Sequence, residues 1–311
     1  MPRRPFRFGV QASGAADRRG WAELARRVED LGYSVLTMAD HLDDQLAPVP
    51  ALMAAADATT DLRIGPMVLA NDYRHPVVLA KEATTIDLLS GGRLELGLGA
   101  GWMQADYDQA GITLDRPGVR IDRLAEAIAV MKGLLAGGPF TFAGEHYRVN
   151  DLAGRPRPAQ RPHPPIVIGG GGRRVLALAA RQADIVGVNV DLRAGVIDAT
   201  TGPTGTADAT AEKIGWIRQA AGARFDDLEL QVRVHVAAIT DDKYAMADAM
   251  APALGVTPAE ALASPHAVVG SAAEVIDILV ERRERWGISY LGLSADALEA
   301  FAPVVAALAG T

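Results

Sequence analysis

The chain has 311 residues, of which 49% are hydrophobic and 22% charged, and it contains no cysteine. The length suits one large α/β domain, and the lack of cysteine excludes disulfides, thiolate catalysis and cysteine metal sites. With a net charge of −7 and acidic and basic residues well mixed, the chain offers no basic face for a nucleic acid backbone. The first residues, MPRRPFRF, lack the apolar run of a secretory signal, and no apolar run in the sequence has membrane-spanning length. We therefore expect a cytoplasmic protein that binds neither nucleic acid nor membrane.

The first part of the chain alternates short apolar runs with amphipathic segments. Strands are predicted over 6–11, 33–38 and 62–70, and a fourth begins at Leu94 and ends in Gly99-Ala100-Gly101. Helices are predicted between these strands, over 17–32, over 48–60 and in the stretch that Pro76 opens. Strands that alternate with helices over short loops indicate parallel pairing through helical crossovers.

The same alternation continues to the C-terminus with longer interruptions. A polar loop to Pro117 precedes a predicted helix over 119–135 and a hairpin over 140–149. The proline-rich segment 155–165 fits a surface crossover better than an interdomain linker, because the strand pattern resumes at once. The Gly- and Thr-rich segment 191–210 is long enough to be a mobile lid. The remaining predictions are strands over 166–168, 184–190, 228–239 and 288–294, and helices over 174–181, 211–221, 244–262 with a proline break, 271–286 and 298–308.

These strands number eight, and a (β/α)8 TIM barrel is the simplest way to close them. We therefore expect an α/β fold in which residues 1–311 form a single barrel domain, with insertions after strands 4, 6 and 7. Ligands of such barrels bind at the carboxyl ends of the strands. Residues just beyond each predicted strand are therefore the candidates for a site.

Asp40 and His41 follow the second strand and are the only adjacent carboxylate and imidazole at a strand end. His41 can exchange a proton near neutral pH, and Asp40 can accept hydrogen bonds from a ligand. A loop cap at Asp40 and a rim contact at His41 would fit the pair equally well. A metal site formed with Asp43 and Asp44 is disfavoured, because no second histidine lies at ligand spacing.

Glycine-rich turns end the fourth and fifth strands. Gly99-Ala100-Gly101 permits a sharp turn or a close approach of backbone to ligand, and Trp102 places a large aromatic side chain beside it. Gly169–Gly172 precede Arg173 at the start of a helix, where free N–H groups and the positive helix end favour an anion. The spacing is neither the dinucleotide fingerprint nor the P-loop. It predicts another kind of phosphate-bearing cofactor, although either turn could be purely structural.

Several motifs together resemble the luciferase-like monooxygenase superfamily. They are Asp40-His41, Arg74-His75-Pro76, Leu89–Arg93 before the GLGAGW segment, Asp106-Tyr107 with Ala110–Ile112, the glycine-rich turn before Arg173, and Phe301-Ala302-Pro303. The resemblance runs from Phe6 to the C-terminus and is greatest to actinobacterial oxidoreductases that use coenzyme F420, a deazaflavin. It implies a barrel whose cofactor ring lies over the strand ends, with its phosphate at the 170–173 turn.

The resemblance also assigns residues. It implies a non-prolyl cis peptide between Met67 and Val68 behind the ring, His41 as the acid or base, and Trp102 packed beside ring or substrate. The implied cofactor site comprises Asp40, Met67, Val68, Ala70, Gly99, Ala100, Gly101, Gly169, Gly170, Gly171, Gly172 and Arg173. One departure matters. The similar F420-dependent sugar-phosphate dehydrogenases have glutamate in place of Trp102 and tryptophan in place of Gln45, so their activity cannot be carried over.

Three functions follow from the resemblance. The first is an F420-dependent oxidoreductase that transfers a hydride between the deazaflavin C5 and a small organic substrate, reducing an activated C=C or C=N bond. The second is an FMN-dependent monooxygenase with the same barrel. The third is a non-catalytic protein that binds a flavin or deazaflavin. No metal is implied, and a homodimer is expected from the resemblance alone.

Overall fold

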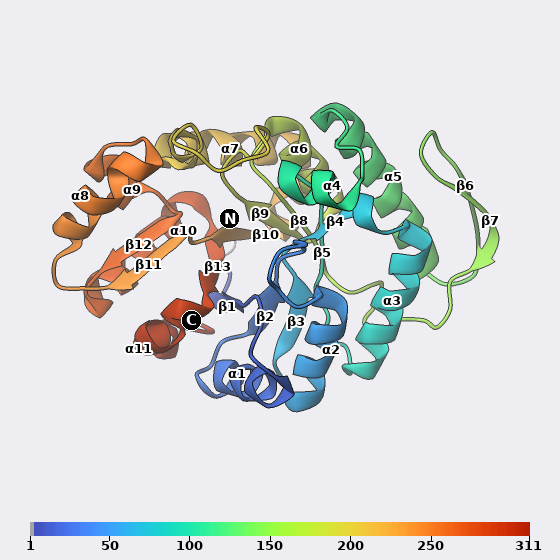
Figure 1. Ribbon diagram of the computed structural model, residues 1–311, viewed down its shortest axis with the longest axis horizontal. Coiled ribbons are helices and arrows are strands. Elements are labelled where there is room, and N and C mark those ends of the chain that lie inside the picture. Colours follow the sequence, from blue (N-terminus) through green and yellow to red (C-terminus); the bar gives the residue numbers. More distant parts are fainter. Residues whose placement is uncertain (1–2) are drawn as a thin grey trace.

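Parallel strands form a barrel at the centre of the computed structural model, which describes residues 3–311 (Figure 1). Residues 1 and 2, which the predicted domain includes, lie outside the described residues. The strands follow one another around the barrel in the order β3-β2-β1-β13-β10-β9-β8-β5-β4. Their bounds are β1 Arg7–Gln11, β2 Val35–Met38, β3 Arg63–Pro66, β4 Leu69–Ala70, β5 Leu96–Gly99, β8 Ile166–Gly170, β9 Ile185–Val188, β10 Glu229–Arg233 and β13 Ile288–Ser294. Strands β2, β5 and β9 are buried along their whole length, because helices cover the outside of the parallel sheet.

The third predicted strand, 62–70, is divided into β3 and β4. Strand β3 pairs with β2, whereas β4 pairs with β5. An additional parallel bridge between Ile64 and Leu94 closes the ring, so the predicted TIM barrel is confirmed. The peptide bond between Met67 and Val68, at the interruption, is cis as expected from the resemblance.

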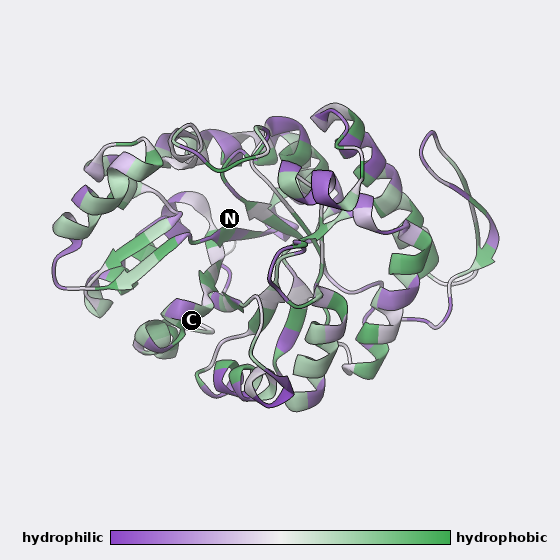
Figure 2. Cartoon of the chain, in the orientation of Figure 1, coloured by the Kyte–Doolittle hydropathy of each residue, from purple (hydrophilic) through white to green (hydrophobic). Residues whose placement is uncertain are grey.

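Helices surround the barrel and cover its strands (Figure 1). Their bounds are α1 Arg18–Asp30, α2 Pro48–Ala58, α3 Pro76–Leu89, α5 Pro117–Leu135, α6 Arg173–Gln182, α7 Ala207–Ala221, α10 Ala272–Trp286 and α11 Leu298–Leu308. Helix α1 shows the pattern: Asp17 caps its N-terminus, and Trp21, Ala25 and Val28 form its buried face. Figure 2 shows mainly hydrophobic strands and helices of mixed character. No helix within residues 3–311 is both long and apolar enough to cross a membrane.

The predicted insertions occur where they were expected, after β5, β9 and β10. The first holds α4 Gln104–Ala110, and beyond α5 a hairpin formed by β6 Pro139–Ala143 and β7 Arg148–Ala153 projects from the barrel (Figure 1). The second contains the short helix η2 Gly202–Gly205. The third contains β11 Val236–Ile239, α8 Lys243–Leu254, α9 Pro258–Ala263 and β12 Ala267–Gly270. The other short helices are η1 Asn71–Tyr73, η3 Gly222–Asp227 and η4 Ala295–Ala297.

Two sequence predictions were wrong in the third insertion and one in the first. The predicted strand 228–239 is two strands, because the chain leaves the barrel after Arg233 and β11 pairs with β12 in a separate parallel sheet. The apolar character continues across that break, so it gives no signal for it. Strand β12 was not predicted, and the loop before Pro117 contains α4. Helix α7 also begins earlier than predicted, because Thr206 caps it.

Candidate active site

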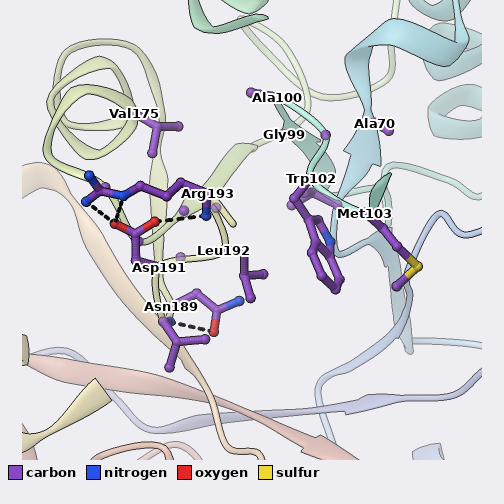
Figure 3. Close-up of a pocket in the computed structure, with 18 of the residues that line it drawn as sticks. Ala70, Gly99, Ala100, Trp102, Met103, Val175, Asn189, Asp191, Leu192 and Arg193 are labelled. Atoms are coloured by element: carbon purple, nitrogen blue, oxygen red, sulfur yellow. Dashed lines mark hydrogen bonds and ion pairs between the residues drawn. The ribbon is translucent and has the colours of Figure 1, made fainter. Parts of the chain in front are cut away.

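The carboxyl ends of the barrel strands open into a cavity of about 680 Å³ (Figure 3). All of the residues that the sequence assigned to the cofactor or to catalysis line this cavity: Asp40, His41, Met67, Val68, Ala70, Gly99, Ala100, Gly101, Trp102, Gly169, Gly170, Gly171, Gly172 and Arg173. Four turns that are far apart in the sequence therefore meet in one place, as the barrel topology requires.

His41 is held by a buried carboxylate that sequence analysis did not assign a role. Its Nδ1 lies 2.7 Å from Oδ2 of Asp106, a residue of α4 that is 4% exposed. An ionised carboxylate only accepts hydrogen bonds, so Nδ1 carries the hydrogen and Nε2 remains available to a ligand. The hydroxyl of Tyr73 and the N–H of Leu42 also donate to this carboxylate, each at 3.4 Å. Burial and the charge of Asp106 raise the pKa of Tyr73, which keeps its hydroxyl protonated at neutral pH.

Trp102 packs against His41 on the side of the cavity. The ring centroids are 5.6 Å apart and the ring planes lie at 90° to each other. Figure 3 shows the indole pointing into the cavity, opposite Leu192 and Asn189. Trp102 therefore restricts the orientation of the imidazole and gives this wall a large apolar surface.

Asp40 is engaged within the protein rather than free. Its Oδ2 accepts hydrogen bonds from the N–H of Ala70 at 2.9 Å and from Nη1 of Arg74 at 2.5 Å, and its Oδ1 accepts one from Nη2 of Arg74 at 3.0 Å. Such a paired arrangement of guanidinium and carboxylate fixes both groups in one geometry. Asp40 thus holds β4 and Arg74 at the edge of the cavity, which is close to the capping role that sequence analysis left open.

The turn after β5 requires glycine at two positions. A Cβ atom added to Gly99 would lie 2.5 Å from Cγ2 of Val68, on the strand segment with the cis peptide. Gly101 has a φ of +74°, and a Cβ atom there would lie 1.9 Å from the hydroxyl oxygen of Tyr107. The backbone of this turn is consequently exposed to the cavity between Val68 and Trp102.

The glycine-rich turn before α6 has the features of an anion site. Cβ atoms would lie 2.4 Å from Cγ1 of Val175 if added to Gly170, and 2.1 Å from the carbonyl oxygen of Val190 if added to Gly171. Gly172 occupies the N-cap position, where it offers no side chain to the N–H groups of the first turn. These groups lack acceptors in the helix and are therefore free to bind an anion at its positive end.

The charged side chains near this turn are mostly paired. Arg174 pairs with Asp122, and Nε of Arg193 lies 2.8 Å from Oδ2 of Asp191. Burial opposes ionisation of Asp191, but the hydrogen bonds from Arg193 outweigh it and lower the pKa of this carboxyl. Arg173 is exposed, and its Nη2 donates to Oε1 of Gln219 at 3.4 Å. It pairs with no acid within residues 3–311, so its charge has no counter-charge there and suits an anion at the turn.

The opposite wall comes from the ends of β9 and β10. Nε2 of His235 lies 2.9 Å from Oδ1 of Asn189. Arg233 donates to the carbonyl oxygen of Gly292 at 3.1 Å and to Oγ of Ser294 at 2.7 Å. Burial lowers the pKa of Arg233 to about 10, so the side chain stays charged at neutral pH. Arg233 was not predicted as a site residue, because the apolar pattern places it inside the predicted strand 228–239 rather than at a strand end.

A second cavity of about 200 Å³ adjoins the first, and Val190, Ile197 and His235 line both. It lies between the insertions that follow β9 and β10. His266 lines it and is 5% exposed, with Nδ1 2.8 Å from the carbonyl oxygen of Arg233. Burial and the neighbouring His235 lower the pKa of His266 to about 3, so its imidazole is neutral in the folded protein.

The metal site considered around His41 would need Asp43 and Asp44 as ligands. Asp43 and Asp44 are exposed, and His41 pairs with Asp106 instead. Within residues 3–311 there is no group of three or more histidine or acidic side chains arranged to hold a metal ion.

The sequence profile of the family described as luciferase-like monooxygenase matches residues 4–286. The chain belongs to this family. Over 187 residues this luciferase-like chain is 30% identical to an FMNH2-dependent dimethylsulfone monooxygenase of Pseudomonas putida, covering 57% of this chain and 51% of that protein. Over 257 residues it is 32% identical to an F420-dependent glucose-6-phosphate dehydrogenase of Nakamurella multipartita, covering 78% of this chain and 71% of that protein. The chain spans only about half the length of the Pseudomonas putida enzyme and of three further curated relatives, with coverages of 48% to 55%.

Solved structures of the luciferase-like family share the whole fold. A coenzyme F420-dependent tetrahydromethanopterin reductase from Methanopyrus kandleri superposes with a TM-score of 0.78 at 19% identity, over 98% of this chain and 99% of that one. A long-chain alkane monooxygenase superposes with a TM-score of 0.76 at 15% identity, over 98% and 91% of the two chains. These likenesses establish the barrel. These four similar proteins are oxidoreductases and monooxygenases, and they include both F420-dependent and FMNH2-dependent enzymes.

Proposed function

We propose that this luciferase-like chain is an F420-dependent oxidoreductase that reduces an activated C=C or C=N bond of a small organic substrate. One observation carries the proposal: a single cavity joins the anion-binding turn before α6 to a histidine whose ring is oriented by a buried carboxylate. Curated relatives that depend on F420 support the choice of cofactor.

The cavity fits a deazaflavin that carries a phosphate. The N–H groups at the start of α6, together with Arg173, suit the phosphate. The small residues Ala70, Gly99 and Ala100 form a wall that a flat ring can approach closely. A cavity of about 680 Å³ has the size of a cofactor site and leaves the side of β9 and β10 for a substrate.

The residues around His41 are suited to proton transfer. When bound in its reduced form, a deazaflavin supplies a hydride from C5. His41 would donate the matching proton from Nε2 when its ring carries hydrogens on both nitrogens, and Asp106 orients the ring by accepting the Nδ1 hydrogen. Trp102 packs against the imidazole ring of His41 and limits the access of water to this ring.

The test is turnover of reduced F420 under anaerobic conditions with two probes, the enone 2-cyclohexen-1-one and the imine 3,4-dihydroisoquinoline. We expect at least one probe to drive oxidation of the cofactor, which is monitored by the visible absorbance of F420. His41→Gln should lose roughly 100- to 10,000-fold in rate, the usual contribution of a general acid or base. His146→Gln is the matched control, since His146 lies on the hairpin outside the cavity. Probe-driven oxidation that His41→Gln leaves unchanged would contradict the mechanism.

An FMN-dependent monooxygenase is the second candidate, because one of the relatives uses FMNH2. Oxygen uptake with reduced FMN and a flavin reductase, without reaction of F420, would select it. The third function, non-catalytic binding of a flavin or deazaflavin, would show as tight cofactor binding without turnover of any probe, unchanged by His41→Gln.

A further inference from the structure

Arg233 faces the proposed cofactor wall from the other side of the barrel. Strands β3 and β4 together occupy one position of the ring. Strand β10 lies four positions from them in either direction, which is the opposite side of the barrel. Along β10, Leu230 and Val232 pack into the hydrophobic core, whereas Gln231 and Arg233 line the cavity. The guanidinium is therefore presented at the mouth of the barrel, opposite Met67 and Val68.

The acids that line the cavity already have hydrogen-bonding partners. Asp40 pairs with Arg74, Asp106 with His41, and Asp191 with Arg193. Arg233 has no acidic partner in the part of the chain that the structure describes; its hydrogen bonds go to a carbonyl and to a hydroxyl. The guanidinium of Arg233 is thus a positive charge that no acid of residues 3–311 balances. It lies on another side of the cavity from the glycine-rich turn, where Arg173 is the cation.

Arg120 also lines the cavity, and within residues 3–311 it has no acidic partner. It is 4% exposed and donates to the main-chain oxygens of Asp115, Ala100 and Gly101, so its role is to hold the turn after β5. Arg233 is more exposed to the cavity, and only two of its five N–H donors have acceptors within residues 3–311.

Asn189 adds a neutral donor on the neighbouring strand end. Its Oδ1 accepts hydrogen bonds from the N–H of Val190 and from Nε2 of His235. Nδ2 is therefore the remaining donor of the amide, and it has no acceptor among the described residues. Strand β9 pairs directly with β10, so Asn189 and Arg233 lie on adjacent strand ends of one wall. Figure 3 shows Asn189 facing Trp102 across the cavity.

We propose that Arg233 and Asn189 bind a carboxylate of the substrate, so that the substrate class is an anionic molecule whose reducible bond lies between this wall and His41. This inference rests on the proposed function and adds the chemistry of recognition to it. A guanidinium donates in a planar fork that matches the two oxygens of a carboxylate. A half-buried cation with unfilled donors gains from such a partner, because partial burial penalises the lone charge.

The balance of charge favours a carboxylate over a phosphate. Arg233 supplies one positive charge and Asn189 none. A carboxylate carries a single negative charge and leaves the pair neutral. A phosphate monoester carries about −1.5 to −2 near pH 7 and would leave excess negative charge in a partly buried site. We therefore expect this wall to prefer planar monoanions, in contrast to the turn before α6.

The test compares binding of three unreactive probes to the F420-loaded protein by calorimetry: benzoate, its neutral isostere benzamide, and phenyl phosphate. A hydrogen bond to a charged group contributes about 1.5–3 kcal/mol, which converts to roughly 10- to 150-fold in Kd. We expect benzoate to bind more tightly than benzamide by that factor and more tightly than phenyl phosphate. Arg233→Gln should abolish the preference for benzoate, whereas Arg19→Gln, the same charge change at an exposed residue, should retain it.

Three results would overturn the inference: equal binding of benzoate and benzamide, a benzoate preference that survives Arg233→Gln, or an F420 affinity that falls as much as the benzoate affinity in that variant. The last would assign Arg233 to the cofactor. Arg233→Lys keeps the charge but not the fork, so it should fold and show a reduced benzoate preference even if Arg233→Gln does not fold.

The same titrations on the protein without F420 separate this inference from the proposed function. If F420 does not bind, a benzoate preference that is lost in Arg233→Gln still supports the carboxylate site while the proposed function fails. If F420 binds and is oxidised by the neutral probes while benzoate shows no preference, the proposed function stands and the carboxylate site is refuted.

Discussion

Replacement of Asp106 by asparagine tests how His41 is prepared for proton transfer. The substitution keeps the size of the side chain but removes its charge and turns one oxygen into an N–H donor. Oδ2 of Asp106 accepts from His41 and Oδ1 from the N–H of Leu42, so asparagine can serve only one of the two. If the amide nitrogen faces Nδ1, that ring nitrogen has to accept and can carry no hydrogen, so the ring cannot hold hydrogens on both nitrogens and donate from Nε2.

The magnitude follows from the hydrogen bond that is lost. Nδ1 and Oδ2 are 2.7 Å apart and the carboxylate is 4% exposed, so this is a short bond to a buried charge. Such bonds contribute about 1.5–3 kcal/mol. If that energy orients the imidazole in the transition state, Asp106→Asn lowers kcat by roughly 10- to 150-fold. Binding of F420 should stay unchanged, because Asp106 lies behind the imidazole and not at the phosphate turn.

The assay is steady-state oxidation of reduced F420 with the probe that turns over, together with a cofactor titration for each variant. Tyr73→Phe is the control: it removes only the 3.4 Å contact to the same carboxylate and should leave kcat nearly unchanged. An Asp106→Asn variant that is as fast as wild type, while His41→Gln is inactive, would refute the orienting role of Asp106.

Three further predictions concern the structure around the site. Gly171→Ala should weaken cofactor binding and destabilise the fold by about 1–3 kcal/mol, because its Cβ would lie 2.1 Å from the carbonyl oxygen of Val190. Asp40→Asn should cost about 1.5–3 kcal/mol of unfolding free energy, since it breaks the paired hydrogen bonds to Arg74. His266 has a folded pKa of about 3 against an ordinary value of 6.5, so only the unfolded chain takes up its proton in that interval. Stability should therefore fall as pH decreases from 6.5 toward 3, by up to about 1.4 kcal/mol per pH unit.

Denaturant titrations check all three, with a matched variant for each. Gly172→Ala should be stable, because the nearest atom to its Cβ is 3.9 Å away. Asp43→Asn should match wild type, since Asp43 is exposed. His266→Asn retains a donor toward the carbonyl of Arg233 and should flatten the acid limb of the stability profile. If Gly171→Ala were as stable as Gly172→Ala, the predicted clash with Val190 would be contradicted. If Asp40→Asn were as stable as Asp43→Asn, the contribution of the bonds to Arg74 would be contradicted. An acid limb that His266→Asn leaves unchanged would contradict the role of His266.

Much of the fold could be predicted from local signals. Helix α11 spans 298–308 as predicted, and the capping box at Ser271 and Glu274 begins α10 where expected. The strand runs and the glycine turns that follow them determine the barrel, and the barrel brings His41, Trp102 and Gly170 together because parallel strands share one carboxyl edge.

The missing parts depend on contacts that sequence patterns do not encode. Helix α4 has seven residues with only Asp106 and Tyr107 buried, too few for a periodic signal. The bond between His41 and Asp106 joins residues 65 positions apart, so neither residue indicates the other. The position of Arg233 depends on where the chain leaves the barrel, and this is set by pairing of β11 with β12 rather than by any change in hydrophobicity.

The most direct test of the proposed function is a parallel fluorescence titration of the purified protein with oxidised F420 and with FMN. We predict that F420 binds with micromolar or lower Kd, that FMN binds much more weakly, and that Gly171→Ala loses the F420 affinity. Preferential binding of FMN would contradict the assignment and make oxygen-dependent chemistry the reaction to assay.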